Sequence, residues 1–358
     1  MKNLISNSEY KDNRLSPIYS IGEGNNKSVK CNRKFYIQST DTIIFKPNRN
    51  TKIDLSIKCN NKYKQYLNLL MLHQDLKDLS ITYKLSTEYI WISFDESVLK
   101  GLYKQYKPIK DRIISIDMNP NYIGYSIVDW KDSETFNIID KGVLSLKHLN
   151  DKFNQLKTNS SDSKKVYLNN KRLFETLQVS NFLIDKMKHY RCSIFAIEDL
   201  NIKSKDSDKG RRFNRLINNQ WNRNKLVNNL FKWCNIYNIN LIKVKCEYSS
   251  FIGNIVYRNL QLPDMILSSI EISRRGFEFY HQYILKDTNI KKNIVFLELS
   301  NNIKRLISQS LEELNINYCY STLFDLYSYL KNCKCRYRVP LQFEESFSQK
   351  SLKYKLIL

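Results

Sequence analysis

The chain has 358 residues and carries 58 Lys and Arg against 35 Asp and Glu, which gives a formal charge of +23. Such a charge favours an anionic partner, nucleic acid first and an acidic membrane surface second. No run of about 18 apolar residues occurs, which excludes a membrane span, and residues 1–7 lack the apolar core of a signal peptide. Eight cysteines in a chain of this length do not make a disulfide scaffold, so we expect an intracellular, cytoplasmic protein.

Residues 1–110 are typical of a small β-rich domain with one helical insertion near 61–79. Pro108 marks a linker at 103–110, because proline removes a backbone donor and interrupts helices and strands. The basic residues of this region suit either a nucleic-acid surface or a solvated strand face. The short β-type runs are 34–38, 42–45 and 89–94, and the basic residues include Lys27, Lys30, Arg33 and Lys34.

From Arg112 the pattern changes to three strands in hairpin order, followed by alternating helices and strands. The run at 193–197 is apolar without alternation, as a buried central strand requires. This order predicts an α/β fold, a mixed sheet with flanking helices, of which the RNase H-like fold is the obvious member. The expected strands are 113–116, 122–128, 137–146, 193–197 and 241–244, and the expected helices are 164–190, 218–237, one beginning at Pro263, and an amphipathic one at 298–315.

Three acidic residues occupy the ends of these elements. Asp117 closes the first strand, Glu198 ends the buried strand, and Asp264 begins a helix. Each also has an ordinary explanation: a turn-starting aspartate, a solvated strand end, and a carboxylate stabilised by the helix dipole. Taken together, they occupy positions from which side chains converge on one edge of such a sheet.

Carboxylates that converge must have their repulsion relieved, and Mg²⁺ or Mn²⁺ are hard cations that prefer oxygen ligands. Two such ions, about 3.5–4 Å apart, could orient an attacking water and stabilise the leaving oxygen of a phosphodiester. The acids in a strongly basic chain therefore predict a metal-dependent endonuclease, with Asp117, Glu198 and Asp264 as catalytic metal ligands.

A basic and aromatic segment follows Glu198 and could track a phosphate backbone, or be a solvated helix face with its aromatic rings buried. Farther on, Arg274 and Arg275 could hold a phosphate beside the metals, or complement the helix dipole before Gly276. The candidate nucleic-acid-binding residues are Lys203, Lys205, Arg211, Arg212, Arg215, Trp221, Arg223, Arg274 and Arg275.

Three segments resemble the RuvC motifs of TnpB-type nucleases and type V CRISPR effectors. They are IISID at 113–117 with Gly124, FAIEDL at 195–200, and PDM at 263–265 with SSIEI at 268–272. The resemblance covers about 112–280 and implies a RuvC-like nuclease domain at 111–285. It also implies a wedge- or recognition-like nucleic-acid-binding domain at 1–110 and a C-terminal helical extension with a basic tail at 286–358. In that transposon-associated family the matching acids bind the catalytic metals, and a guide RNA directs cleavage of target DNA.

The chain departs from the family in two places. Residues 251–262 contain no cysteine where the family usually has a zinc ribbon, and Cys333 and Cys335 are too closely spaced for a tetrahedral site. We therefore expect no zinc and a loop at 249–262. The region before the nuclease motifs is also shorter than a full wedge and recognition module.

The leading hypothesis is an RNA-guided, Mg²⁺-dependent DNA endonuclease of TnpB-like kind. One alternative is a guide-independent nuclease that resolves Holliday junctions as a symmetric dimer. Another is a guided DNA-binding repressor that does not cut. The sequence leaves the oligomeric state open.

Overall fold

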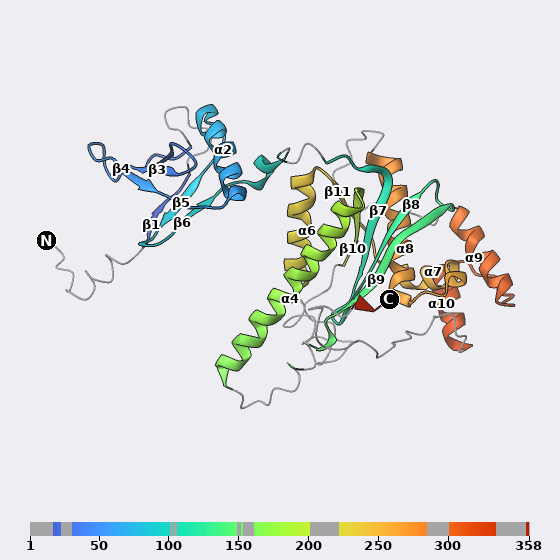
Figure 1. Cartoon of the computed structure of the whole chain (residues 1–358). Coiled ribbons are helices and arrows are strands. Elements are labelled where there is room, and N and C mark those ends of the chain that lie inside the picture. Colours follow the sequence, from blue (N-terminus) through green and yellow to red (C-terminus); the bar gives the residue numbers. More distant parts are fainter. Residues whose placement is uncertain are drawn as a thin grey trace. The chain divides into compact units, whose positions relative to one another are not determined.

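The structure is a computed structural model, and it describes residues 17–22, 31–100, 102, 106–148, 152, 161–200, 222–284, 301–333 and 356–357. The chain divides into two compact units, Met1–Leu102 and Tyr103–Leu358 (Figure 1). Each unit has a hydrophobic core of its own.

The described residues of the first unit form two antiparallel three-stranded sheets and the α-helix α2. One sheet has the order β2-β3-β4 and the other has the order β1-β5-β6. Helix α2 begins where the Asn60 side chain accepts a hydrogen bond from the Tyr63 backbone N–H, and it ends at Lys77, which is left-handed with φ 59°. The elements are β1 (Ile18–Ser20), β2 (Phe35–Ile37), β3 (Thr42–Phe45), β4 (Ile53–Ser56), α2 (Asn61–Leu76), β5 (Thr82–Leu85), β6 (Ile90–Ser93) and the 3₁₀ turn η1 (Glu96–Leu99).

Asn32 ties the strands of this unit together from a buried position. Its side-chain nitrogen donates to the carbonyls of Ser20 and Ile81 at 3.2 and 2.9 Å. Its side-chain oxygen accepts from the Ser20 hydroxyl at 3.0 Å and from the Phe35 backbone N–H at 3.0 Å. One amide therefore fixes the end of β1 and the start of β2 relative to the segment that leads into β5.

The second unit is built on a six-stranded sheet with the order β11-β10-β7-β8-β9-β12. Strands β7, β8 and β9 pair as antiparallel neighbours, while β10 pairs parallel to β7 and β11 pairs parallel to β10. The mixed sheet and the chain order of its first five strands are confirmed. The strands are β7 (Ile109–Met118), β8 (Tyr122–Trp130), β9 (Phe136–Ser145), β10 (Cys192–Asp199), β11 (Asn240–Lys245) and β12 (Leu356–Ile357).

Helices cover both faces of this sheet. Helix α8 (Asp264–Phe279) contacts β7 to β11, while α4 (Asp162–His189) and α6 (Arg223–Tyr237) contact each other, β10 and β11. Ser115 on β7 pairs with Ser126 on β8 and donates to a carbonyl of α8. The preceding residue of β8, Tyr125, points to the other face, and its ring centroid lies 5.8 Å from that of Phe182 on α4.

Gly124 lets α8 lie close to the sheet. A Cβ at this position would lie 2.5 Å from the Met265 carbonyl oxygen, closer than side chains tolerate. The first turn of α8 is therefore held directly over the start of β8.

The predicted loop at 249–262 is wrong, because the structure has helix α7 (Ser249–Val256) and the 3₁₀ turn η4 (Arg258–Leu260) there. Phe251, Ile252 and Ile255 of α7 are buried against α9 (Asn301–Glu313) and α10 (Leu323–Asn332). The predicted amphipathic helix corresponds to α9, and α10 was not expected. After α8 the chain continues as the π-helical turn η5 (Tyr280–Ile284).

In the part of the chain that the structure describes, no helix has both the length and the apolar character needed to cross a membrane.

Candidate active site

Two carboxylates from neighbouring strands meet under α8. Asp117 and Glu198 are the second-to-last residues of β7 and β10, and the parallel register pairs Ile116 with Ile197, one residue before each. Residues at matching positions of paired strands point to the same face, so both acids project toward α8. Only 5% of Asp117 and 6% of Glu198 is exposed to solvent.

The electrostatics of the pair are unfavourable for two charges. Burial raises the pKa of Asp117 well above its usual value, and the negative charges of Glu198 and Asp264 raise it further. The two carboxyl groups therefore lie close enough for the charge of Glu198 to oppose the ionisation of Asp117. Burial and these two charges together make ionisation of Asp117 unfavourable.

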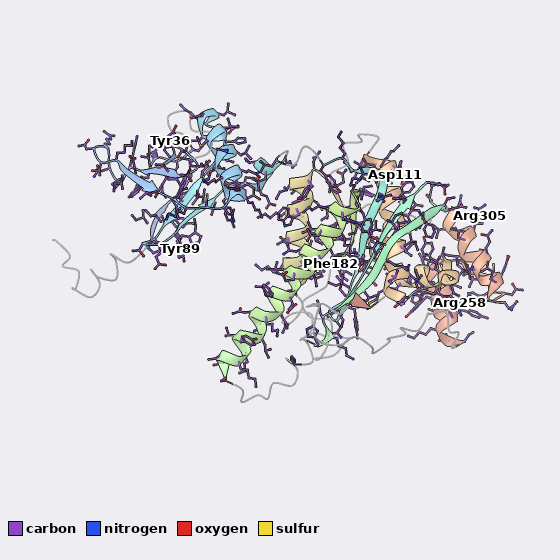
Figure 2. The ribbon with its side chains drawn as sticks, viewed as in Figure 1. Tyr36, Tyr89, Asp111, Phe182, Arg258 and Arg305 are labelled. Atoms are coloured by element: carbon purple, nitrogen blue, oxygen red, sulfur yellow. The ribbon has the colours of Figure 1, made fainter. Side chains whose placement is uncertain are left out.

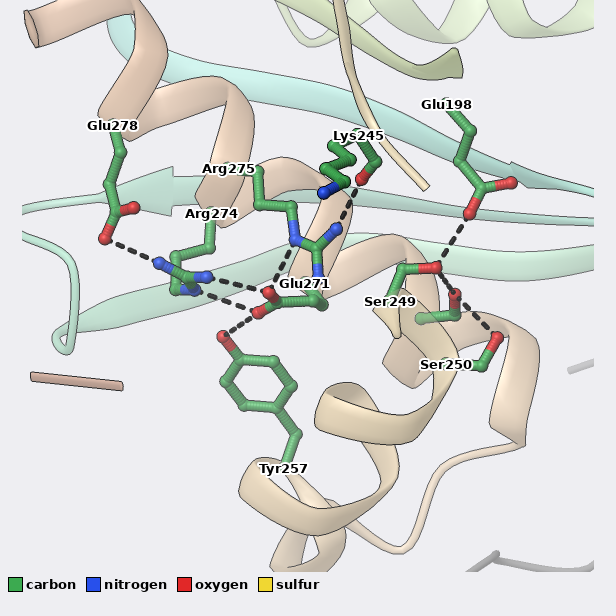
Figure 3. Close-up of polar contacts among 10 residues, drawn as sticks. Glu198, Lys245, Ser249, Ser250, Tyr257, Glu271, Arg274, Arg275 and Glu278 are labelled. Atoms are coloured by element: carbon green, nitrogen blue, oxygen red, sulfur yellow. Dashed lines mark hydrogen bonds and ion pairs between the residues drawn. The ribbon is translucent and has the colours of Figure 1, made fainter. Parts of the chain in front are cut away.

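Glu198 has more support than Asp117. Burial raises its pKa, but hydrogen bonds from Ser249 and the Met118 backbone N–H, together with the charge of Arg275, work in the opposite direction. The Ser249 hydroxyl donates to Glu198 Oε1 at 2.8 Å (Figure 3). Glu198 is therefore the member of the pair that the surroundings favour as the anion.

Helix α7 supplies two polar side chains that the sequence reasoning did not assign to the site. Ser249 stands at its start and bonds Glu198, and Asn254 lies five residues later. Asn254 donates one hydrogen bond to Asp264 and another to the Ser250 carbonyl at 2.7 Å. The sequence signal nearest to these two residues is the pair of serines at 249–250.

Asp264 is the first residue of α8 and is half-buried. It lies close enough to Asp117 for its charge to raise the pKa of that carboxyl. One of its oxygens is engaged by Asn254. The structure thus brings all three predicted acids into one region, with Asp117 and Glu198 in contact and Asp264 bonded to α7.

The donor atoms fit Mg²⁺ or Mn²⁺ in their chemistry, because they are carboxylate and hydroxyl oxygens and two of the carboxylates are buried with unrelieved repulsion. Among the described residues, however, no three His, Cys, Asp or Glu side chains are arranged to hold a metal ion as they stand. Asp117 and Glu198 are the ligands at hand, and Asp264 would complete the set after releasing Asn254.

Arg274 and Arg275 lie in the core, which corrects the expectation that they hold a phosphate. Arg274 donates to both oxygens of the fully buried Glu271 at 2.9 and 2.7 Å and pairs with Glu278 at 2.5 Å. Arg275 donates to Glu271 at 2.8 Å and to the Lys245 carbonyl (Figure 3). Burial of α8 on the sheet directs these side chains inward, where Glu271 neutralises them.

The basic segment is described only at its end. Arg223 begins α6 and donates to the Leu200 carbonyl, immediately beyond the strand that carries Glu198. The remaining predicted contacts lie outside the described residues; they are Lys203, Lys205, Arg211, Arg212, Arg215 and Trp221.

Neither a family model nor a curated protein matches the chain. Solved structures that resemble it include the RuvC protein of Thermus thermophilus and the T. thermophilus RuvC in complex with a Holliday junction substrate. Each is 8% identical and aligns over 48% of this chain with a TM-score of 0.29, covering 95% and 94% of the respective RuvC chain. At that TM-score the likeness carries no argument about activity.

Proposed function

We propose that this protein is a divalent-metal-dependent nuclease that hydrolyses phosphodiester bonds at Asp117, Glu198 and Asp264. The observation that carries the proposal is the close approach of Asp117 and Glu198, two buried acids on adjacent strands, with the charge of Glu198 opposing the ionisation of Asp117. Structural carboxylates are rarely buried together in this way, because burial and mutual repulsion both oppose ionisation. The formal charge of +23 supports a polyanionic substrate.

When bound, the metal would supply the charge that activates a water and stabilises the leaving oxygen. The chain's own residues prepare that site. Ser249 holds Glu198 by a hydrogen bond to its Oε1 and so orients the carboxylate. Asp117 would hold the metal as a carboxylate, because a metal ligand must be deprotonated.

A finer proposal concerns the substrate: the nuclease cuts DNA under the direction of a guide RNA, in the manner of TnpB-type nucleases. One support is the match of three segments to RuvC motifs. The other is the strand order, because an RNase H-like sheet requires antiparallel strands such as β7, β8 and β9 followed by parallel strands such as β10 and β11.

The test of the chemistry is a pair of nearly isosteric variants, Asp117→Asn and Glu198→Gln. Each should reduce Mg²⁺-dependent cleavage of DNA by at least about 100-fold while DNA binding in EDTA stays unchanged. Asp199→Asn is the matched control, because the neighbouring residue of the same strand points to the opposite face and should retain activity. Wild-type rates in both variants would refute the metal site.

The test of the guide is sequencing of RNA that co-purifies with the protein from its native locus. A discrete RNA encoded beside the gene should appear and should restore cleavage when added back to stripped protein. If no RNA co-purifies and the protein is a stable dimer that cuts four-way junctions, guide-independent resolution of Holliday junctions would replace guided cleavage as the proposed function. Binding of RNA and target DNA without cleavage at any Mg²⁺ concentration would indicate a repressor.

A further inference from the structure

The β1-β5-β6 sheet of the first unit carries aromatic and basic side chains on one exposed face. Tyr19 pairs with Lys84 across β1 and β5, and Lys84 pairs with Trp91 across β5 and β6. The three residues therefore form one row across the sheet and project from the same side. Tyr19 is 61% exposed and Trp91 is 46% exposed.

The row continues along β6 toward the hairpin turn. Tyr89 lies two residues before Trp91, is 63% exposed, and has its ring centroid 6.0 Å from that of Trp91 (Figure 2). Lys84 Nζ lies 5.1 Å from the centroid of the Trp91 ring. We call the residues Tyr19, Lys84, Tyr89 and Trp91 the aromatic row.

The opposite face of the same sheet is the one that the core uses. Tyr83 is fully buried, and Leu85, Ile90 and Ile92 pack against the same core. The alternation of the strands thus places aliphatic residues inside and leaves the rings and the lysine outside. Folding of this unit does not require large flat rings on the outer face, where polar residues would serve equally well.

The chemistry of the row selects one kind of occupant. Adjacent strands lie about 4.8 Å apart, so Tyr19 and Trp91 flank Lys84 at a spacing that allows two bases to stack with a phosphate between them. Exposed rings on an antiparallel sheet are a recurrent platform for unpaired bases, and a lysine supplies the charge for the backbone. A duplex hides its base faces and cannot use such a row.

We propose that the aromatic row binds a single-stranded stretch of nucleic acid, by base stacking on Tyr19, Tyr89 and Trp91 and by phosphate contact with Lys84. The proposal extends the proposed function, since it adds a binding surface in the first unit for the substrate or guide of the carboxylate site. It concerns binding alone and therefore stands or falls separately from cleavage.

The experiment measures the affinity of the full-length protein, freed of nucleic acid at high salt, for labelled oligonucleotides of about 16 nucleotides by fluorescence anisotropy in EDTA. The probes are one sequence as single-stranded RNA, as single-stranded DNA and as duplex DNA. Tyr19→Ala and Trp91→Ala should each weaken single-strand binding by about 5- to 150-fold, with a smaller effect on the duplex. Trp91→Phe should restore most of the loss because it keeps a ring. The comparison of the RNA and DNA probes identifies which strand the row prefers.

The control is Tyr63→Ala, which removes a tyrosine of similar exposure, 54%, from α2 of the same unit. It should bind like the wild type. Lys84→Gln should reduce the slope of log affinity against log salt concentration by about one, because one fewer phosphate is neutralised.

Wild-type affinity in Tyr19→Ala and Trp91→Ala, or an equal loss in Tyr63→Ala, would overturn the proposal. A lower melting temperature without loss of affinity would also overturn it, by indicating that another part of the chain covers the row. If these variants lose binding while Asp117→Asn still binds normally, the aromatic row acts separately from the metal site.

Discussion

Replacing Glu271 by glutamine should destabilise the second unit strongly. Glu271 is fully buried and accepts hydrogen bonds from the guanidinium groups of Arg274 and Arg275 at 2.7–2.9 Å. The Glu271→Gln variant keeps the shape of the side chain and removes its charge, which leaves Arg274 paired with Glu278 and removes the carboxylate that Arg275 contacts. Removing one partner of a buried ion pair costs about 3–5 kcal/mol, so we expect a loss of that size in the free energy of unfolding.

The loss can be measured by urea unfolding followed through tryptophan fluorescence. Trp130 donates to the Ser273 hydroxyl of α8 at 2.8 Å, so its emission reports on the core that contains Glu271. Asp162→Asn is the matched control, because Asp162 and Lys165 have the same i,i+3 spacing as Glu271 and Arg274 but are exposed. An exposed pair contributes at most about 1 kcal/mol, so this variant should unfold nearly like the wild type. A loss below about 1 kcal/mol in Glu271→Gln, or an equal loss in both variants, would refute the reasoning.

The same network predicts a dependence on pH. Burial raises the pKa of Glu271, but the charges and hydrogen bonds of Arg274 and Arg275 outweigh burial and hold it below its ordinary value of 4.5. Because the folded pKa lies below the unfolded one, the stabilisation is complete above pH 4.5 and is lost as the pH falls through the folded pKa. The difference in stability between wild type and Glu271→Gln should therefore be constant at neutral pH and shrink in acid.

Two further changes test the first unit and the site. Asn32→Ala should lower the unfolding free energy of the first unit by at least about 2 kcal/mol, because the variant removes the side-chain donor to the buried carbonyls of Ser20 and Ile81. Urea unfolding that resolves a separate transition for each unit would measure this loss. An unchanged transition of the first unit would contradict the prediction. Ser249→Ala removes the hydrogen bond to Glu198 Oε1 and should raise the Mg²⁺ concentration for half-maximal cleavage about 10- to 100-fold, whereas an unchanged Mg²⁺ titration would show that Ser249 does not orient the ligand.

Much of the second unit could be predicted because its strands carry distinct patterns. The run at 193–197 is apolar at every position but its first. The strand that contains it, β10, is contacted by α8 and by α4. Pro263 and the acid directly after it predict the helix that begins there. These signals are local, and they depend on which faces of an element must avoid water.

Helix α7 was mistaken for a loop because its signal depends on partners that are distant in sequence. Its apolar residues, Phe251, Ile252 and Ile255, form a stretch too short to distinguish a helix from an irregular segment. They become helical in the context of α9 and α10, which cover them. The polar partners of the site on α7, Ser249 and Asn254, were missed for the same reason.

By itself, the sequence determined the strand pattern, the mixed sheet and the three acids at the ends of their elements, since burial periodicity and end signals are written in neighbouring residues. Only the tertiary structure decided which charges face the site. Arg274 and Arg275 are residues of a kind that binds phosphate, yet α8 buries them against Glu271, whereas Asp117 lies beside two acids, Glu198 and Asp264, whose charges raise its pKa. The reason is physical: the state of a charge is set by the groups packed around it, and those come from elements far apart along the chain.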